Sequence, residues 1–251
     1  MQLKMTGRVA LVAGVGDEVG MEIAQRLAAG GATVLLGDKP GLQQAAALAA
    51  KIKAEGGKAA AVGVELADAQ SVRTCVADIV ARHGRIDILV NNGPEVAGKA
   101  IVDLSAQDFE ASIARSLGSQ FHLLREVVPV MQKNKGGRVV NLSKLAYLGI
   151  AGQADTAAAK SALFGLTRSI ALEMARHNVT VNTVVKGDIA LAEMNEEQQA
   201  KIAGGIPVKR MGTAADVAYA VAFFASDNAD YLTGQTFFVC GGKSNYFSMS
   251  V

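Results

Sequence analysis

Short runs of β-branched and other apolar residues alternate with longer helical patterns along almost the whole chain. The expected strands cover 8–13, 33–36, 59–64, 86–90, 138–142, 179–185 and 236–239, and the expected helices cover 21–29, 43–55, 71–82, 109–132, 157–176 and 214–225. Alternation of this kind predicts an α/β fold, in which helices cover both faces of a mostly parallel sheet. Because the crossover connections are right-handed, the sheet should be doubly wound.

Length and composition exclude several classes of protein. The 251 residues suit one α/β domain spanning 1–251, and half of them are apolar, which supplies a sizeable core. The formal net charge is +2, and the basic residues are scattered, so no nucleic-acid partner is expected. Cys75 and Cys240 lack metal-ligand spacing and fit a reduced, cytoplasmic protein. No apolar run is long enough to span a bilayer, so no membrane association is expected.

A glycine-rich turn joins the first expected strand to the first helix. Gly14, Gly16 and Gly20 lie where a Rossmann-type domain brings its backbone close to a dinucleotide pyrophosphate. The alternative is a tight strand-to-helix turn that binds no ligand. Asp38 follows the second strand, where a carboxylate would accept hydrogen bonds from an adenosine ribose. Its alternative is a solvent-facing turn residue before Pro40.

Further motifs occur in a fixed order along the chain. They are Asp87–Asn92 (DILVNN), Gly137–Ser143 (GRVVNLS), Ala157–Lys160 (AAAK), Val179–Asn182 (VTVN), and Leu232–Thr236 (LTGQT) with Gly241-Gly242. With them the chain resembles, end to end, the short-chain dehydrogenase/reductase family. Within that family it looks most like the 3-oxoacyl-carrier-protein reductases and related hydroxyacyl-CoA dehydrogenases. The resemblance implies one domain of this type over 1–251, although a fold alone does not establish a function.

The resemblance also implies a set of four catalytic side chains, and only two are present. Ser143 and Lys160 match the serine and the lysine, whereas Thr156 stands at the tyrosine position and Ser116 at the asparagine position. A threonine hydroxyl is far more basic than a phenol, whose pKa is about 10. General acid–base groups contribute about 10²–10⁴ in rate, so this loss is severe. Tyr147 is the nearest other phenol, and its alternative role is loop packing.

The cofactor side departs from the family pattern as well. Glu18 replaces a glycine of the phosphate loop, Pro94 ends the segment that reads Asn-Asn-Ala-Gly in the family, Lys186 replaces the proline of Pro-Gly, Leu191 lies near a threonine position, and Glu65 replaces an aspartate. A carboxylate about 4 Å from a phosphate would oppose binding by roughly 4 kcal/mol at an effective dielectric near 20. We therefore expect no functional cofactor site, with Gly14, Gly16, Gly20, Asp38 and Asn91 as its vestiges.

These departures predict a non-catalytic subunit that supports an active paralogous subunit of the same family. Ser143 and Lys160 are then remnants, and NAD is bound by the partner subunit rather than by this chain. The assembly would be a hetero-oligomer, a tetramer or larger, catalysing NAD-dependent oxidation of an alcohol or hydroxyacyl-CoA. Small residues at Ala158, Ala162, Gly165 and Ser169 form one stripe that would allow close helix approach between subunits. The alternative is that this stripe packs against the chain's own sheet.

Two other functions are compatible with the sequence. The first is an active NAD-dependent hydroxyacyl oxidoreductase with unusual site residues, supported by Asp38, Ser143 and Lys160. The second is a binding module that uses the vacated cleft for an acyl-CoA. For the non-catalytic subunit, we expect side chains of the chain to close the cleft. Glu18 would point into the cleft and approach Lys186, directly or through water, and Lys160 would find its own oxygen acceptor. The alternative is an open cleft with all three side chains in solvent.

Overall fold

A computed structural model describes residues 4–41, 43–94 and 96–246. Its strands form one parallel seven-stranded sheet with the order β3-β2-β1-β4-β5-β6-β7. The strands are β1 (Val9–Ala13), β2 (Thr33–Asp38), β3 (Lys58–Gly63), β4 (Ile88–Asn91), β5 (Gly137–Lys144), β6 (Val179–Lys186) and β7 (Thr236–Val239). The prediction of a doubly wound α/β fold is confirmed, and the sheet is parallel throughout.

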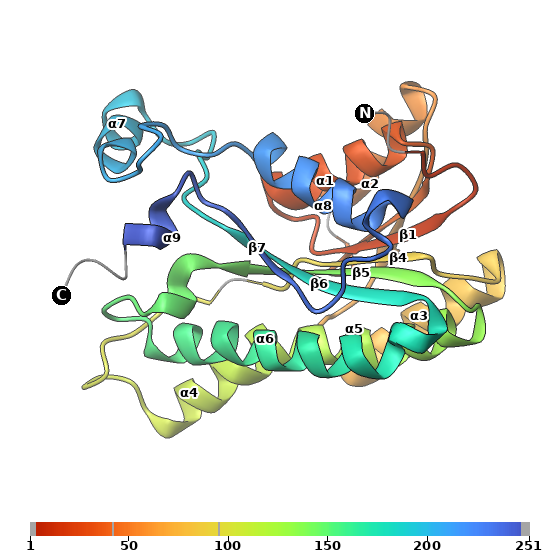
Figure 1. Cartoon of the computed structure of the whole chain (residues 1–251), viewed down its shortest axis with the longest axis horizontal. Helices are drawn as coiled ribbons and strands as arrows, with labels where there is room; N and C mark the ends of the chain where they lie inside the picture. Colours follow the sequence, from red (N-terminus) through yellow and green to blue (C-terminus); the bar gives the residue numbers. More distant parts are fainter. Residues whose placement is uncertain (1–3, 42, 95, 247–251) are drawn as a thin grey trace.

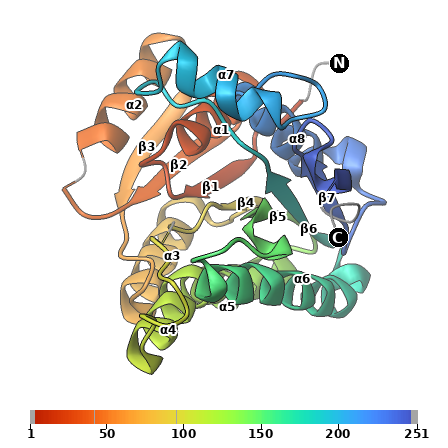
Figure 2. The ribbon, with the colours of Figure 1, turned by 90° about the vertical axis from the view of Figure 1, so that its left-hand side faces the viewer.

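Helices cover both faces of the sheet, and Figures 1 and 2 show the two layers. One layer holds α1 (Glu18–Ala29), α2 (Gln43–Ala54) and α8 (Ala214–Ala225); the other holds α3 (Ala69–His83), α5 (Ser119–Lys133) and α6 (Ala154–Met174). Alternate strand residues supply the two cores: Val12 and Leu36 pack with the first layer, and Leu11 and Leu35 pack with the second. This burial on both faces explains why the strands are continuously apolar.

The long helix expected over 109–132 is interrupted. Its first part is α4 (Ala106–Ile113), which begins with a capping box formed by Ser105 and Asp108. A π-helical turn, Ala114–Gly118, separates α4 from α5 and contains the buried Ser116. Turns of this type are frequent at functional sites. The structure therefore places the residue at the family's asparagine position on an irregular turn within the helix.

Two short helices were not predicted. They are α7 (Glu196–Gly204), which is polar and starts at an Asn195–Gln198 capping box, and α9 (Lys243–Tyr246). The capping pattern was the available signal for α7, since its sequence lacks an apolar stripe. Across the described ranges, no helix has both the length and the apolar character needed to cross a membrane.

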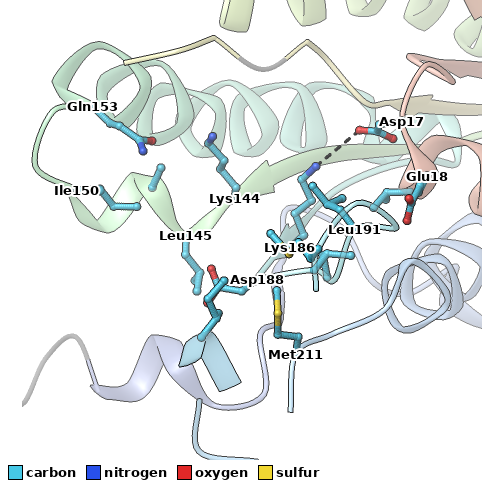
Figure 3. Close-up of a pocket in the computed structure, with 16 residues that line it drawn as sticks. Asp17, Glu18, Lys144, Leu145, Ile150, Gln153, Lys186, Asp188, Leu191 and Met211 are labelled. Carbon is cyan, nitrogen blue, oxygen red and sulfur yellow. Dashed lines mark ion pairs between the residues drawn. The ribbon is translucent and has the colours of Figure 1, made fainter. Parts of the chain in front are cut away.

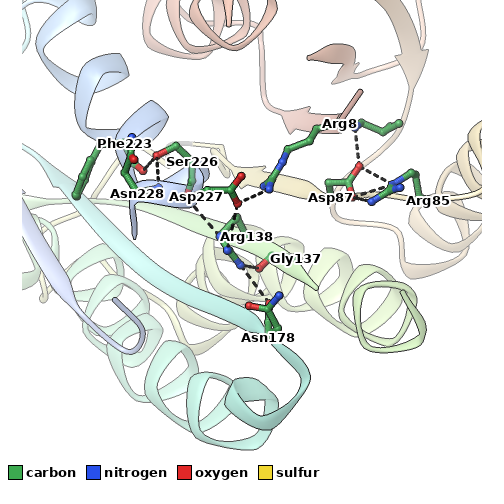
Figure 4. A network of polar contacts seen from close by, with 11 residues as sticks. Arg8, Arg85, Asp87, Gly137, Arg138, Asn178, Phe223, Ser226, Asp227 and Asn228 are labelled. Carbon is green, nitrogen blue, oxygen red and sulfur yellow. Dashed lines mark hydrogen bonds and ion pairs between the residues drawn. The ribbon is translucent and has the colours of Figure 1, made fainter. Parts of the chain in front are cut away.

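A polar network fastens the amino ends of the central strands, at the edge of the sheet opposite the glycine turn (Figure 4). Asp227 pairs with Arg8 and, at 3.5 Å, with the buried Arg138 at the start of β5. Burial lowers the pKa of Arg138 and nearby Arg8 lowers it further, while Asp227 acts in the opposite direction. Asp87 accepts the Val9 backbone N–H at 2.8 Å, which joins the start of β1 to the residue before β4.

The glycine turn is packed directly onto the end of β4. Gly14 has a positive φ of 88°, and a Cβ atom there would lie 1.9 Å from the Asn92 carbonyl oxygen. A Cβ atom on Gly20 would lie 2.1 Å from the Gly14 carbonyl oxygen. The fold itself therefore requires glycine at both positions, whether or not a cofactor binds.

We predict that Gly14→Ala lowers the free energy of unfolding by roughly 3 kcal/mol or more, because the methyl group overlaps backbone that cannot move aside. Denaturant unfolding measures this change. The matched control is Gly56→Ala, where φ is 85° but no atom lies within 4 Å of the added Cβ. That variant should lose only about 1–2 kcal/mol from the backbone conformation. Equal losses for the two variants would contradict the steric explanation.

Candidate functional site

The candidate site lies at the carboxyl ends of the strands, beside the point where the strand order reverses between β1 and β4. A cavity of about 470 Å³ opens there between the glycine turn, the ends of β5 and β6, and the segment before α7 (Figure 3). Its apolar wall includes Leu145, Ile150, Leu191, Met194 and Met211. Its charged lining consists of Asp17, Glu18, Lys144, Lys186 and Asp188. The cavity is thus an apolar pocket with ionic groups of both signs at its margin.

Asp17 organises the glycine turn. Its side chain caps α1 by accepting the Gly20 N–H at 2.6 Å, and it also accepts a hydrogen bond from the Asn92 side chain at 3.0 Å. The Asn92 amide donates at 2.8 Å to the Gly14 carbonyl oxygen as well. Helix α1 therefore starts at Glu18, three residues earlier than expected, because Asp17 supplies the cap. A carboxylate of the chain uses an N–H group of the helix terminus to which a phosphate would bind.

Glu18 does not make the expected direct contact with Lys186 among the described residues. The Lys186 ammonium lies 3.8 Å from the Asp17 carboxylate, and Figure 3 shows this side chain extended toward Asp17. Glu18 instead accepts the backbone N–H of Ala192 at 2.9 Å. Lys186 pairs with Asp17 rather than with Glu18 because the helix cap fixes the Asp17 carboxylate on the side of the turn that faces β6. Two adjacent acidic residues thus connect the glycine turn to the segment after β6.

The cleft is not closed by these contacts, contrary to expectation. The cavity of about 470 Å³ remains beside Lys186, and a second cavity of about 260 Å³ lies between the glycine turn and the ends of β2 and β4. Gly14, Gly16, Asp38, Glu65 and Pro94 are among the residues that line the second cavity. The contacts of Asp17 with Lys186 and of Glu18 with Ala192 cross the cleft but do not fill it.

Asp38 lies at the end of β2, as its position in the sequence predicted. Its side chain accepts the backbone N–H of Lys39 at 2.8 Å while still lining the second cavity. A ribose-binding carboxylate and a turn-forming carboxylate are both consistent with this geometry. In the family pattern this position corresponds to the adenosine side of the cofactor site, and here a cavity of about 260 Å³ lies there.

The four catalytic positions are all buried. Ser143 ends β5, Thr156 and Lys160 lie one turn apart on α6, and Ser116 lies in the π-helical turn that contacts α6. The hydroxyl oxygens of Ser116, Ser143 and Thr156 have no hydrogen-bond partner among the described residues. None of the four lines the larger cavity, which is bordered instead by neighbouring residues such as Lys144 and Gln153. All four side chains therefore lie in the interior, behind the residues that line the larger cavity.

Asn91 lies in the core. It is fully buried and donates to the Gln120 carbonyl oxygen at 3.0 Å and to the Asn141 side chain at 3.4 Å. These bonds join β4 to α5 and β5. Asn91 therefore has a structural role in this chain, apart from any contact with a cofactor.

Tyr147, the nearest other phenol, is packed among aromatic rings. Its ring packs edge-on against Phe164 with a centroid distance of 4.8 Å and lies 5.9 Å from Phe238, beyond the larger cavity. Burial, followed by nearby Cys240, raises the pKa of Tyr147 above its ordinary value. A phenol that is harder to ionise is a poorer proton-transfer group at neutral pH. The loop-packing alternative describes this residue.

The stripe of small residues on α6 faces outward. Ala162, Gly165 and Ser169 are exposed and Ala158 is half-buried, whereas the opposite face of the helix packs on the sheet. A Cβ atom on Gly165 would meet no atom within 4 Å. The alternative of packing against the chain's own sheet is therefore excluded. The outer surface of α6 is shallow enough for another helix to approach closely.

Asp17 and Asn92 shape the candidate site through hydrogen bonds that the sequence did not predict. Asp17 directly precedes a helix, where aspartate is a preferred cap, and this pattern was the available signal. Asn92 has no comparable local signal, because its role depends on the sheet order that sets β4 beside β1. Only the tertiary structure brings the two side chains together.

Comparison with known proteins gives consistent results. The family described as Enoyl-(Acyl carrier protein) reductase matches residues 14–244. A putative short-chain dehydrogenase/reductase from Burkholderia xenovorans has a TM-score of 0.90 and 34% sequence identity, covering 97% of this chain and 98% of that one. A putative gluconate dehydrogenase from Agrobacterium tumefaciens has a TM-score of 0.91 and 27% identity, with coverage of 97% and 98%.

Two curated relatives are similar over nearly their whole length. The (2S)-[(R)-hydroxy(phenyl)methyl]succinyl-CoA dehydrogenase subunit BbsC of Thauera aromatica is 47% identical over 253 aligned positions, which cover 100% of both chains. The 3-oxoacyl-[acyl-carrier-protein] reductase FabG of Staphylococcus aureus is 34% identical, covering 96% of this chain and 99% of that protein. The first of these relatives is named as one subunit of a dehydrogenase.

We predict that Glu18→Ala speeds hydrogen exchange at the Ala192 amide about tenfold, since the charged acceptor of that N–H is lost. Hydrogen exchange followed by NMR measures the rate. The control is Glu18→Gln, which keeps an acceptor oxygen and should retain most of the protection. Unchanged exchange in Glu18→Ala would mean that this hydrogen bond does not hold the segment after β6.

Proposed function

This chain belongs to the short-chain dehydrogenase/reductase family, and from that premise we propose that it is a non-catalytic subunit of a hetero-oligomeric dehydrogenase. Its active partner is a paralogous subunit of the same family, which binds NAD and oxidises an alcohol or hydroxyacyl-CoA. The substrate class of the assembly is that of the relative from Thauera aromatica, a branched aromatic hydroxyacyl-CoA.

The observation that carries the proposal is the position of Asp17. Its carboxylate accepts the Gly20 N–H at the start of α1 and lies 3.8 Å from Lys186 across the cleft. Glu18 adds a second carboxylate at the same helix terminus. A pyrophosphate in this place would meet two negative charges and a helix N–H that already has an acceptor. The glycine turn therefore does not fit the cofactor, and we assign no step of hydride transfer to this chain.

The side chains of the proton-transfer site give independent support. Thr156 is buried, its hydroxyl has no partner among the described residues, and it stands where the family has tyrosine. Because phosphate binding and proton transfer are separate tasks, loss of both is better explained by a supporting role than by a single altered contact.

A supporting role requires a surface for the partner, and the outer layer of α5 and α6 offers one. The small residues of α6 leave its outer face shallow, and Phe121 and Leu172 are exposed on the same layer. An exposed apolar helix face with small residues suits close packing against a helix of another subunit. The name of the relative from Thauera aromatica, a subunit, agrees with an assembly of more than one chain.

The second candidate is an active NAD-dependent hydroxyacyl oxidoreductase. The cavity of about 260 Å³ beside Asp38 favours it, because the adenosine side of the cofactor site keeps an open shape. Nucleotide titration separates the two candidates directly.

We predict that the isolated chain binds NAD more weakly than about 1 mM, as measured by calorimetry. Replacing both carboxylates, with Asp17→Ser and Glu18→Gly together, should tighten binding at least tenfold by removing their repulsion of the phosphates. The matched control is Glu22→Gln, which removes a carboxylate farther along α1 and should leave affinity unchanged. Micromolar affinity of the unaltered chain would overturn the non-catalytic assignment.

We further predict that Thr156→Tyr alone creates no turnover, because the restored phenol still lacks a bound nicotinamide. The assay is NAD reduction with a 3-hydroxyacyl-CoA by the purified chain, without any partner. Robust turnover in this variant would mean that the carboxylates of the glycine turn do not block the cofactor.

A further inference from the structure

A third cavity, of about 240 Å³, lies between the 96–104 segment, α4 and the first turn of α6. It is separate from the cleft, and α4 projects beyond the layer of α5 and α6, away from the sheet (Figures 1 and 2). Asp155, Ser112 and Arg115 line this cavity together with Lys99 and Asp108. No part of the proposed cofactor or substrate chemistry uses these residues.

Asp155 is the unusual member of this set. Its side chain is only 2% exposed, and its Oδ1 atom is buried without a hydrogen-bond partner. Within the described ranges it forms no ion pair, and the Ser112 hydroxyl beside it also has no partner. Burial of a carboxylate is unfavourable unless the carboxylate is paired and hydrogen-bonded. The position of Asp155 in the first turn of α6 offsets only a small part of this cost.

The other charges around the cavity leave Asp155 uncompensated. Lys99 and Asp108 neutralise each other at 2.8 Å. Arg115 is exposed, and its guanidinium forms no ion pair with Asp155. Asp155 and Ser112 are thus two buried, unpartnered polar side chains in the wall of this cavity.

The volume of the cavity and the residues around it indicate which kind of group could occupy it. The volume is below the ~300–1,000 Å³ of most small-molecule sites and suits one long side chain. Ile101 and Val102, the latter 88% exposed, lie between lining residues of the 96–104 segment, and exposed Phe109 follows Asp108 on α4. A charged pocket flanked by exposed apolar side chains has the composition of an interface hot spot. Arginine is one of the residues enriched at such sites, and its charge complements that of Asp155.

We propose that this cavity receives an arginine or lysine side chain of the partner subunit, which pairs with Asp155 while the apolar residues around it pack against the partner. The identity of the partner rests on the proposed function; the chemistry of the pocket does not. Turning of Arg115 into the cavity is the intramolecular alternative, and it would exclude the partner's side chain.

The first experiment titrates the isolated chain with N-acetyl-arginine amide, using N-acetyl-citrulline amide as the neutral isostere, by saturation-transfer NMR. We expect the arginine probe to bind at least tenfold more tightly than citrulline, and Asp155→Asn to abolish that preference. Arg115→Gln should leave the preference intact. Equal binding of the two probes, or a preference that survives Asp155→Asn, overturns the proposal.

The second experiment uses the assembled protein. The tagged chain is purified with its family partner, which is identified by sequence, and dissociation of the complex is measured for Asp155→Asn and Arg115→Gln. We expect at least tenfold weaker association for Asp155→Asn only. A complex that tolerates Asp155→Asn overturns the pocket and leaves the proposed function standing. Absence of a family partner overturns the proposed function, and the probe titration then decides the pocket alone.

Thermal unfolding of the isolated variants distinguishes a docking role from a structural one. An unpaired buried carboxylate predicts that Asp155→Asn melts no lower than the unaltered chain. A lower melting temperature for both Asp155→Asn and Arg115→Gln would indicate that these residues pair within the chain, and it would overturn the proposal.

Discussion

The contact between the glycine turn and the end of β4 is the constraint on which this structure depends. The strand order reverses between β1 and β4, so the turn after β1 must pass over the first residues after β4. The backbones of Gly14 and Asn92 pack there without room for a Cβ atom on Gly14. The Asn92 side chain donates hydrogen bonds to the Gly14 carbonyl oxygen and to the Asp17 carboxylate. Helix α1 can start only where this packing directs it. The same contact fixes the edge of the cleft and determines which groups face it.

Much of this arrangement is predictable from local sequence. Continuous apolar strands and periodic helices predict the doubly wound sheet, because burial on both faces requires that pattern. The polar helix α7 escaped notice because it has no apolar stripe, and the π-helical turn escaped because no local pattern specifies it. At the site, the sequence predicted Asp38 at the end of β2 and an outward or inward stripe on α6, but the choice of face required the sheet. The sequence could not predict the partner of Lys186, because the helix cap orients the carboxylate of Asp17, rather than that of Glu18, toward β6.

Under the proposed function, the carboxylates of the turn alter a binding site without harm to its fold. Helix α1 needs acceptors for its first N–H groups, and a phosphate can provide them only when a cofactor is bound. Asp17 provides one permanently, and Glu18 connects the turn to the segment after β6. An N–H group at the start of α1 therefore has its acceptor within the chain. Two acidic side chains improve the isolated fold by the same electrostatic interaction that weakens the affinity for an anionic ligand.

Glycine at the turn carries less functional information than its motif suggests. In a dinucleotide-binding turn, glycine lets the backbone approach the pyrophosphate. Here Gly14 and Gly20 are already required by contacts with Asn92 and with each other, because any Cβ atom would overlap backbone. The glycines would persist after cofactor binding was lost, since their replacement would damage the core first. Glu18 faces no such packing constraint, and neither Thr156 nor Ser116 holds a hydrogen bond through its hydroxyl among the described residues. Glu18, Thr156 and Ser116, whose identities the fold does not fix, are therefore more informative about the chemistry of this chain than the glycines are.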